Sequence, residues 1–174
     1  MVIILNGTSS AGKSSIAQKL LDKLKEPYFI FGVDRFLEPS MPIRLNMDIP
    51  EDLEIIDRSL SGFNKALGCY AQEIDFMIVD HVLQKPQRII ELAEALQYSE
   101  VYFVGVTAPL EIIEAREKLR NDRQLGTARS QYEQFRKYQY DILIDTSKCT
   151  AEEAADKIIA NLKRGTALKS SAKF

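Results

Sequence analysis

The sequence predicts an α/β fold in which a mostly parallel five-stranded sheet is flanked by helices. Two observations support this prediction. Apolar runs of strand type alternate with stretches of helical periodicity through most of the 174 residues. A glycine-rich loop at residues 7–14 stands between the first apolar run, residues 1–6, and the first amphipathic stretch. Alternation of this kind is typical of successive βα units, which form parallel sheets.

The loop at residues 7–14 matches the phosphate-binding pattern G-x-x-x-x-G-K-[ST] at every fixed position. Its backbone N–H groups are expected to surround a polyphosphate, with Lys13 on the β- and γ-phosphates and the Ser14 hydroxyl on Mg²⁺. The residues predicted to bind a nucleoside triphosphate are Gly7, Thr8, Ser9, Ser10, Ala11, Gly12, Lys13, Ser14 and Ser15. The alternative is a Gly/Ser-rich turn that binds nothing. It is disfavoured because a predicted strand precedes the loop and a predicted helix follows it, which is the context that a phosphate-binding loop needs. The fold class is therefore a three-layer P-loop NTPase fold of the nucleotide-kinase type.

Length and composition predict one globular domain at residues 1–164 and a disordered tail at 165–174. The net charge of −2 gives no electrostatic reason to expect nucleic acid or an anionic membrane as a partner. The N-terminus shows no basic leader and no apolar run approaches a membrane span, so we expect a cytoplasmic protein. Cys69 and Cys149 lie far apart without metal-ligand spacing, which favours two reduced thiols. The oligomeric state stays open, with a homodimer as one option.

Two aspartates are predicted to lie at the carboxyl ends of strands, at the edge of the sheet where the loop lies. A strand at 28–31 leads to Asp34, which then faces the ligand crevice; an N-cap role for Asp34 is compatible with this. The strand at 75–81 carries Asp80 near its end, as in a Walker B element, where a carboxylate lies near Mg²⁺ and holds a metal-bound water. The alternative for Asp80 is a polar strand end without a metal. His81, the one histidine, is expected to be structural.

The remaining elements follow from hydrophobic periodicity and from its interruptions. Helices are predicted at about residues 13–25, 60–72, 85–98 and from Thr150, where Glu153 completes a capping box, and strands at 101–106 and 140–145. Residues 37–61 contain three prolines and no clean period, so we expect a loop with short helical pieces. This loop either forms an acceptor pocket or covers the sheet edge, and the sequence does not decide between the two.

Arginines gather at about residues 116–137, where a glycine break separates two helical pieces. The arginines are Arg116, Arg120, Arg123, Arg129 and Arg136, and the break includes Gly126. A guanidinium group stays charged and pairs with two phosphate oxygens at once, so we interpret this segment as a lid over the phosphates. The alternative is a solvated charged face in which the arginines pair with Glu114, Glu117 and Asp122.

A series of short motifs spans the chain in order, from about residue 3 to residue 160. They are Ile4-Leu5-Asn6 with the loop at 7–14, Phe31-Gly32-Val33-Asp34, Met41-Pro42, Ile78-Val79-Asp80, Val104-Gly105-Val106, Arg116-Glu117, Arg120-Asn121-Asp122-Arg123, Gln131, Tyr140-Asp141 and Asp145-Thr146. This set resembles the chloramphenicol phosphotransferase-like kinases. The resemblance implies transfer of the γ-phosphoryl group of ATP to a small-molecule hydroxyl, with Asp34 as general base and Arg116, Arg120 and Arg123 on the phosphates. Residues 41–63 differ from the drug-phosphorylating enzyme, as do lid residues beyond Gly126, where Phe135-Arg136 stand in place of an expected histidine.

The sequence therefore predicts an ATP- and Mg²⁺-dependent O-phosphotransferase acting on a chloramphenicol-like antibiotic or a related metabolite. Its predicted catalytic residues are Asp34, Lys13, Arg120 and Arg123; Arg116 and Arg120 also bind the nucleotide, and Ser14 and Asp80 hold the metal. One alternative is a nucleotide or metabolite kinase of related fold, which needs arginines around an anionic acceptor; residues 37–60 offer only Arg44 and Arg58. A second alternative is a nucleotide-binding regulatory module without turnover.

Overall fold

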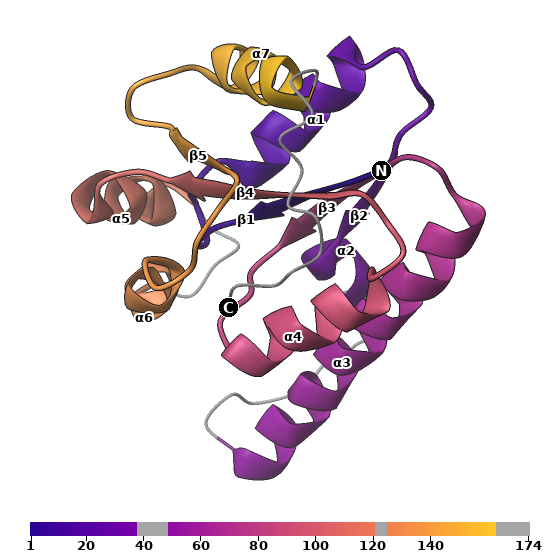
Figure 1. Cartoon of the computed structure of the whole chain (residues 1–174). Coiled ribbons are helices and arrows are strands. Elements are labelled where there is room, and N and C mark those ends of the chain that lie inside the picture. Colours follow the sequence, from indigo (N-terminus) through magenta and orange to yellow (C-terminus); the bar gives the residue numbers. More distant parts are fainter. Residues whose placement is uncertain (38–48, 121–124, 163–174) are drawn as a thin grey trace.

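Five parallel strands form the central sheet of the computed structural model, which describes residues 1–37, 49–120 and 125–162 (Figure 1). The strands are β1 (Val2–Asn6), β2 (Phe29–Gly32), β3 (Met77–His81), β4 (Val101–Thr107) and β5 (Ile142–Asp145). Their order across the sheet is β2-β3-β1-β4-β5, and every described pairing between them is parallel. The predicted fold class is confirmed, and each strand lies within a few residues of its predicted range.

β1 lies in the middle of the sheet, so its carboxyl end has a neighbour on each side. Leu5 is paired with Asp80 of β3 and with Val104 of β4. Gly32, at the end of β2, is paired with Asp80 as well. The loop after β1, the carboxylate of β3 and the segment after β2 therefore meet at one edge of the sheet, where open α/β sheets bind their ligands.

Helices cover both faces of the sheet and complete three layers. α1 (Lys13–Lys23) and α7 (Ala151–Leu162) lie together on one face, while α3 (Pro50–Glu73) and α4 (Pro86–Ala95) lie together on the other (Figure 1). The side chains of β1 alternate between these layers because successive residues of a strand point to opposite faces. Ile3 and Leu5 pack in the core with α1 and α7, whereas Val2 and Ile4 pack in the core with α3 and α4.

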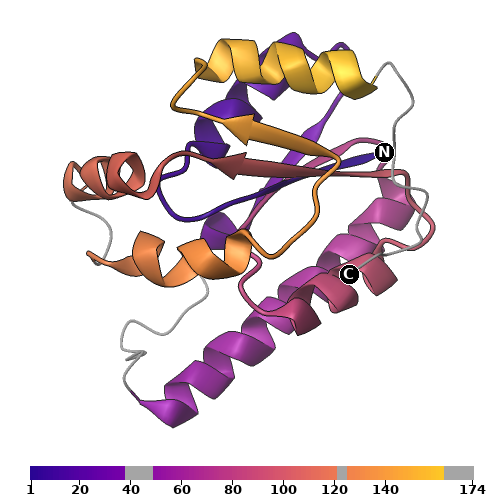
Figure 2. The ribbon, with the colours of Figure 1, turned by 60° about the vertical axis from the view of Figure 1, so that its left-hand side comes forward.

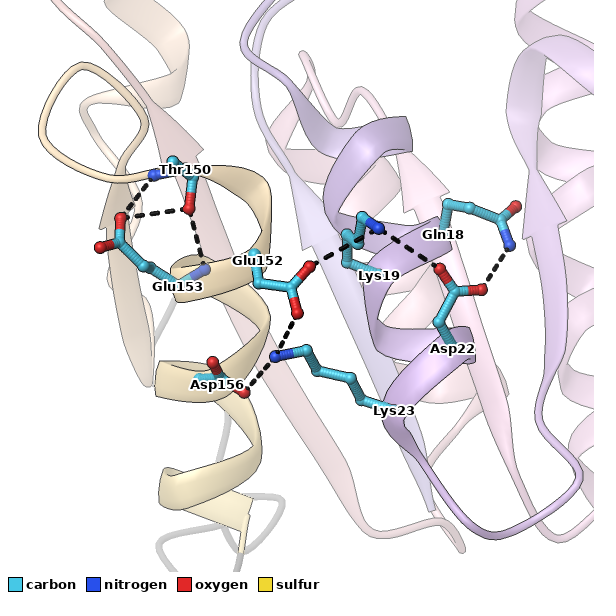
Figure 3. Close-up of polar contacts among 8 residues, drawn as sticks. All are labelled: Gln18, Lys19, Asp22, Lys23, Thr150, Glu152, Glu153 and Asp156. Atoms are coloured by element: carbon cyan, nitrogen blue, oxygen red, sulfur yellow. Dashed lines mark hydrogen bonds and ion pairs between the residues drawn. The ribbon is translucent and has the colours of Figure 1, made fainter.

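Polar contacts join α1 to α7 at the surface (Figure 3). Lys23 Nζ lies 2.6 Å from Asp156 Oδ1 and 2.9 Å from Glu152 Oε1. The predicted capping box is present: the Glu153 N–H donates to Thr150 Oγ1 at 3.2 Å, and the Thr150 N–H donates to Glu153 Oε2 at 2.8 Å. Exposed ion pairs contribute little to stability, so the shared apolar core is what chiefly holds the two helices together.

α3 shows that the prediction for residues 37–61 is wrong over its second half. We expected a loop with short helical pieces and a helix from residue 60, yet one continuous helix runs from Pro50 to Glu73. Pro50 stands in the first turn, where the missing N–H has no helical partner to lose. The amino-terminal part of α3 extends away from the sheet (Figure 2), and Leu53 and Ile55 are exposed there, so no buried stripe marks it in the sequence. Residues 38–48 lie outside the described residues.

Three shorter helices complete the described chain: α2 (Val33–Leu37), α5 (Leu110–Lys118) and α6 (Thr127–Phe135). α5 and α6 are the two helical pieces predicted for the lid, and they lie beside each other beyond the end of β4 (Figures 1 and 2). The predicted tail at 165–174 falls outside the described ranges. Within those ranges, no helix combines the length and apolarity that a membrane span requires.

Candidate active site

The glycine loop joins β1 to α1, and its two glycines are needed for different reasons. A Cβ atom on Gly7 would lie 2.2 Å from the carbonyl oxygen of Val106, so only glycine lets the loop pass β4 this closely. Gly12 has a φ of 101°, in the left-handed region that L side chains rarely adopt. The backbone thereby turns directly into α1, which begins at Lys13. A helix N-terminus reached in this way is suited to bind phosphate.

Lys13 and Asp80 bring opposite charges beside the loop. Lys13 is 7% exposed, and its ammonium group donates to the carbonyl oxygen of Thr8 at 2.9 Å, across the loop. The same Nζ lies 3.9 Å from Asp80 Oδ1. A buried cation beside the loop favours a ligand that brings negative charge.

Ser14 and Asp80 form a pair of oxygen ligands that fits a hydrated magnesium ion. The Ser14 hydroxyl donates to Asp80 Oδ2 at 2.6 Å, so the two residues predicted to hold the metal lie in contact. Among the described residues, no group of three or more His, Cys, Asp or Glu side chains could hold a metal by itself. Mg²⁺ suits such a sparse set, because it keeps several waters and takes further oxygen ligands from bound phosphates.

One cleft of about 650 Å³ connects the loop with Asp34. The loop, α1 and the lid line it with residues that include Ser9, Ser10, Gly12, Lys13, Ser14, Ser15, Arg116 and Arg120, whereas β3, α2, α3 and the segment after β3 contribute Asp80, Val33, Asp34, Leu37, Leu60, Val82 and Gln84. The Ser10 hydroxyl is buried and has no hydrogen-bond partner in the described part of the chain, so a phosphate oxygen would satisfy it. Asp34 lies in the first turn of α2 rather than at its N-cap.

The lid arginines divide into residues that line the cleft and residues on the surface. Arg116 and Arg120 line the cleft. Arg129 instead pairs with a glutamate of α5, through contacts of 2.6 and 3.0 Å at the surface, and Arg136 is exposed. The lid interpretation is therefore supported for the first two, and the charged-face alternative describes Arg129. Arg123 lies outside the described residues.

Arg116 reaches the loop through Thr146, which follows β5. Its guanidinium group donates to Thr146 Oγ1 at 2.8 Å and to the Thr146 carbonyl oxygen at 3.0 Å. The Thr146 hydroxyl lies 2.9 Å from the carbonyl oxygen of Ala11, to which it can donate. Arg116 thus connects α5 with the far side of the loop and presents a planar cation at the wall of the cleft.

His81 is a buried and neutral residue behind the cleft. Its Nδ1 accepts the Val82 N–H at 2.8 Å, so Nε2 carries the proton and donates to Asn64 Oδ1 at 3.0 Å. Burial, with the nearby charge of Lys13, lowers the pKa of His81 to about 3. These contacts support the structural role that we expected for this histidine.

Sequence reasoning missed the roles of three polar residues around the site, namely Asn6, Tyr140 and Gln131. Asn6 Nδ2 donates to the Tyr140 hydroxyl at 2.9 Å, and Asn6 Oδ1 accepts the Leu83 N–H at 2.8 Å. Gln131 Oε1, from α6, accepts the Ser9 N–H at 2.7 Å. These bonds join positions 134, 77 and 122 residues apart along the chain. Of these residues, only Asn6 gave a local sign of its role in the sequence, because it is a polar residue that ends an apolar run. In the structure it is 1% exposed.

Known proteins match this chain over most of its length. The profile of the family described as chloramphenicol phosphotransferase-like protein matches residues 1–163. A Mycobacterium tuberculosis (strain H37Rv) protein that carries the name "Putative O-phosphotransferase" is 27% identical over 182 residues, which cover 90% of this chain and 80% of that protein.

Solved structures share the fold at lower sequence identity. A tunicamycin resistance protein of Deinococcus radiodurans superimposes with a TM-score of 0.65 at 22% identity, over 92% of this chain and 94% of that one. The APS kinase of Mycobacterium tuberculosis gives 0.66 at 15% identity, over 93% and 96%. The shikimate kinase of Aquifex aeolicus gives 0.64 at 18% identity, over 95% and 98%. With a P-loop kinase fold, and with a profile match along nearly its whole length, the chain belongs to the chloramphenicol phosphotransferase-like family of phosphotransferases.

Proposed function

We propose that the protein is an ATP- and Mg²⁺-dependent O-phosphotransferase that moves the γ-phosphoryl group to a hydroxyl of a small molecule. The observation that carries the proposal is that Asp34 and the phosphate-binding loop line one cleft. A phosphate site and a carboxylate that can accept a hydroxyl proton share one space, as phosphoryl transfer to an alcohol requires.

The donor side of the cleft supplies charge and orientation. ATP would supply the phosphoryl group, and Mg²⁺ would offset the charge of its phosphates. Ser14 would hold the metal directly and Asp80 through water. The loop N–H groups and the cations Lys13, Arg116, Arg120 and Arg123 stabilise negative charge on the transferring group. Phosphoryl transfer needs little covalent chemistry from the protein, so this arrangement supplies most of what the reaction demands.

Asp34 acts as the general base in this proposal. The acceptor oxygen attacks phosphorus, the bond to the oxygen that bridges the β- and γ-phosphates breaks, and ADP leaves. The hydroxyl proton passes to the Asp34 carboxylate, so the acceptor oxygen does not carry a positive charge as its new bond forms.

The acceptor side of the cleft favours an uncharged acceptor with apolar surface. Besides Asp34, the described residues that α2, α3 and the segment after β3 contribute are Val33, Leu37, Leu60, Val82 and Gln84, none of which carries a charge. An anionic acceptor is bound best by arginine or lysine. Arg58 is not part of the cleft lining, and Arg44 falls outside the described residues. We therefore favour a hydroxylated antibiotic of chloramphenicol type, or a related metabolite, over an anionic metabolite.

A phosphotransfer screen over hydroxylated antibiotics, sugars and nucleosides, read as a gain of one phosphoryl mass, tests the proposal. The first acceptor found is then given to Asp34→Asn. We expect ATP binding to persist and the transfer rate to fall by about 10²–10⁴-fold, the range that general base catalysis contributes. Asp22→Asn makes the same change at an exposed position of α1 and is expected to keep the wild-type rate.

Two results would contradict parts of the proposal. Transfer by Asp34→Asn at the wild-type rate would remove Asp34 as the base. Tight ATP binding without acceptor-stimulated turnover across the whole panel would instead favour the regulatory module.

A further inference from the structure

Gln131 is a buried lid residue that contacts the phosphate-binding loop directly. It lies on α6, is 8% exposed, and accepts the backbone N–H of Ser9 at 2.7 Å. Both residues line the cleft. The lid helix is thereby attached to the loop by a side chain that lines the cleft proposed to hold the phosphates.

The bond to Ser9 determines how the carboxamide of Gln131 is oriented. A backbone N–H only donates, so the atom that faces Ser9 is Oε1, and Nε2 occupies the other branch of the planar amide. Within residues 1–37, 49–120 and 125–162, Nε2 makes no hydrogen bond. A neutral group with two N–H donors is therefore held in place at the wall of the cleft.

We propose that Gln131 is a further phosphate-contacting residue, whose Nε2 donates to an oxygen of the γ-phosphoryl group. This step rests on the proposed function, because it needs a nucleoside triphosphate in the loop. Donors that are oriented before the reaction begins stabilise developing charge without reorganisation, and the Ser9 bond supplies that orientation. Lys13 and the arginines supply charge, whereas Gln131 adds a donor of fixed direction.

A purely structural role for Gln131, as the partner of the Ser9 N–H, makes a different prediction. Gln131→Glu keeps an acceptor for Ser9 but replaces the two N–H donors with a negative charge. Gln131→Ala removes the acceptor and the donors together. If the role of Gln131 is structural, the protein tolerates Glu at this position and does not tolerate Ala. If Gln131 contacts the γ-phosphate, Glu is the change that damages nucleotide binding more, because the carboxylate repels the triphosphate.

Calorimetric titration with Mg·AMPPNP and Mg·ADP measures the contact without knowledge of the acceptor. We expect Gln131→Glu to weaken Mg·AMPPNP binding about ten- to a hundredfold more than Mg·ADP binding, since a hydrogen bond to a charged group is lost only for the triphosphate. Gln134→Glu is the matched control on the same helix. Gln134 donates to the Tyr138 hydroxyl at 2.6 Å and does not line the cleft, so this variant should keep the wild-type ratio of the two affinities.

The outcomes separate this inference from the proposed function. Wild-type protein that binds neither nucleotide contradicts the proposed function. Wild-type protein that binds both, with Gln131→Glu unchanged or weakened equally for the two, overturns the role of Gln131 alone. Should the Gln131 variants fail to fold, NMR of wild-type side-chain amides decides: no glutamine NH₂ signal that responds to Mg·AMPPNP but not to Mg·ADP would overturn it as well.

Discussion

A short chain of buried polar groups lies behind the cleft and holds the segment after β3. Val82 donates to His81, His81 donates to Asn64, and Asn64 Nδ2 donates to the carbonyl oxygen of Arg88 at 3.1 Å. Val82 lines the cleft, and Asp80 immediately precedes His81. The chain therefore positions an apolar wall residue and a metal-site carboxylate without burying a charge, as long as the histidine stays neutral.

His81 should make the stability of the protein depend on pH. Its pKa is lowered from 6.5 to about 3 in the folded protein, chiefly by burial. Between these values the unfolded chain binds a proton that the folded chain does not, so the free energy of unfolding falls as the pH decreases. From pH 7.5 to pH 5.5, this group should cost the wild type about 1.4 kcal/mol. Urea denaturation at the two pH values measures the loss.

His81→Gln is the comparison that isolates this contribution from the titrating carboxylates. A glutamine amide can accept the Val82 N–H and donate to Asn64, yet it does not titrate. We expect the variant to lose about 1.4 kcal/mol less than the wild type over the same interval. Equal losses in the two proteins would mean that His81 has the same pKa in the folded and unfolded states.

At the scale of elements, Glu117 holds the two lid helices together. It is 2% exposed, and its carboxylate accepts the N–H groups of Gly126 and Ala128, each at 2.8 Å, where α6 begins. A carboxylate at a helix N-terminus is favoured by the helix dipole. Glu117→Ala leaves these N–H groups without their acceptor, and we expect the free energy of unfolding to fall by about 3 kcal/mol, as urea denaturation would measure.

Glu114→Ala is the matched control on α5. Glu114 forms an ion pair with Arg129 whose side chains are 26% and 64% exposed, respectively. Exposed pairs of this kind contribute about 0–1 kcal/mol, so the variant should lose little stability. Similar losses for the two glutamate variants would show that the buried carboxylate does not hold the joint between α5 and α6.

The elements also show which features a sequence can predict. The sheet and the strand–loop–helix context of the phosphate loop followed from local patterns. Asp80 was expected at the same edge as the loop, because parallel strands bring their carboxyl ends to one edge. The start of α3 could not be predicted in this way, because its exposed apolar residues form no stripe and Pro50 resembled a helix breaker. The roles of Asn6 and Gln131 escaped prediction because their partners lie far away in the chain, and no local rule pairs such positions.

At the scale of the whole molecule, Asn6 joins three distant segments at the carboxyl edge of the sheet. It accepts the N–H of Leu83 and donates to the hydroxyl of Tyr140, which in turn donates to the carbonyl oxygen of Phe135 at 3.2 Å. The ring of Tyr140 packs between Phe103 and Phe135, at centroid distances of 4.7 and 5.0 Å. The end of β1, the wall of the cleft and the end of α6 are therefore connected through one asparagine and one tyrosine.

A double-mutant cycle on Asn6 and Tyr140 measures this connection. Burial raises the pKa of the Tyr140 phenol, so it stays a neutral group that both donates and accepts. Tyr140→Phe keeps the ring and should cost about 1 kcal/mol, whereas Asn6→Ala also strands the buried Leu83 N–H and should cost about 2–3 kcal/mol. Because both variants remove the same Asn6–Tyr140 bond, the double variant should lose about 0.5–1.5 kcal/mol less than the sum of the two. Strictly additive losses in urea denaturation would show that the two residues act separately, and that the lid helix is not connected to the sheet through them.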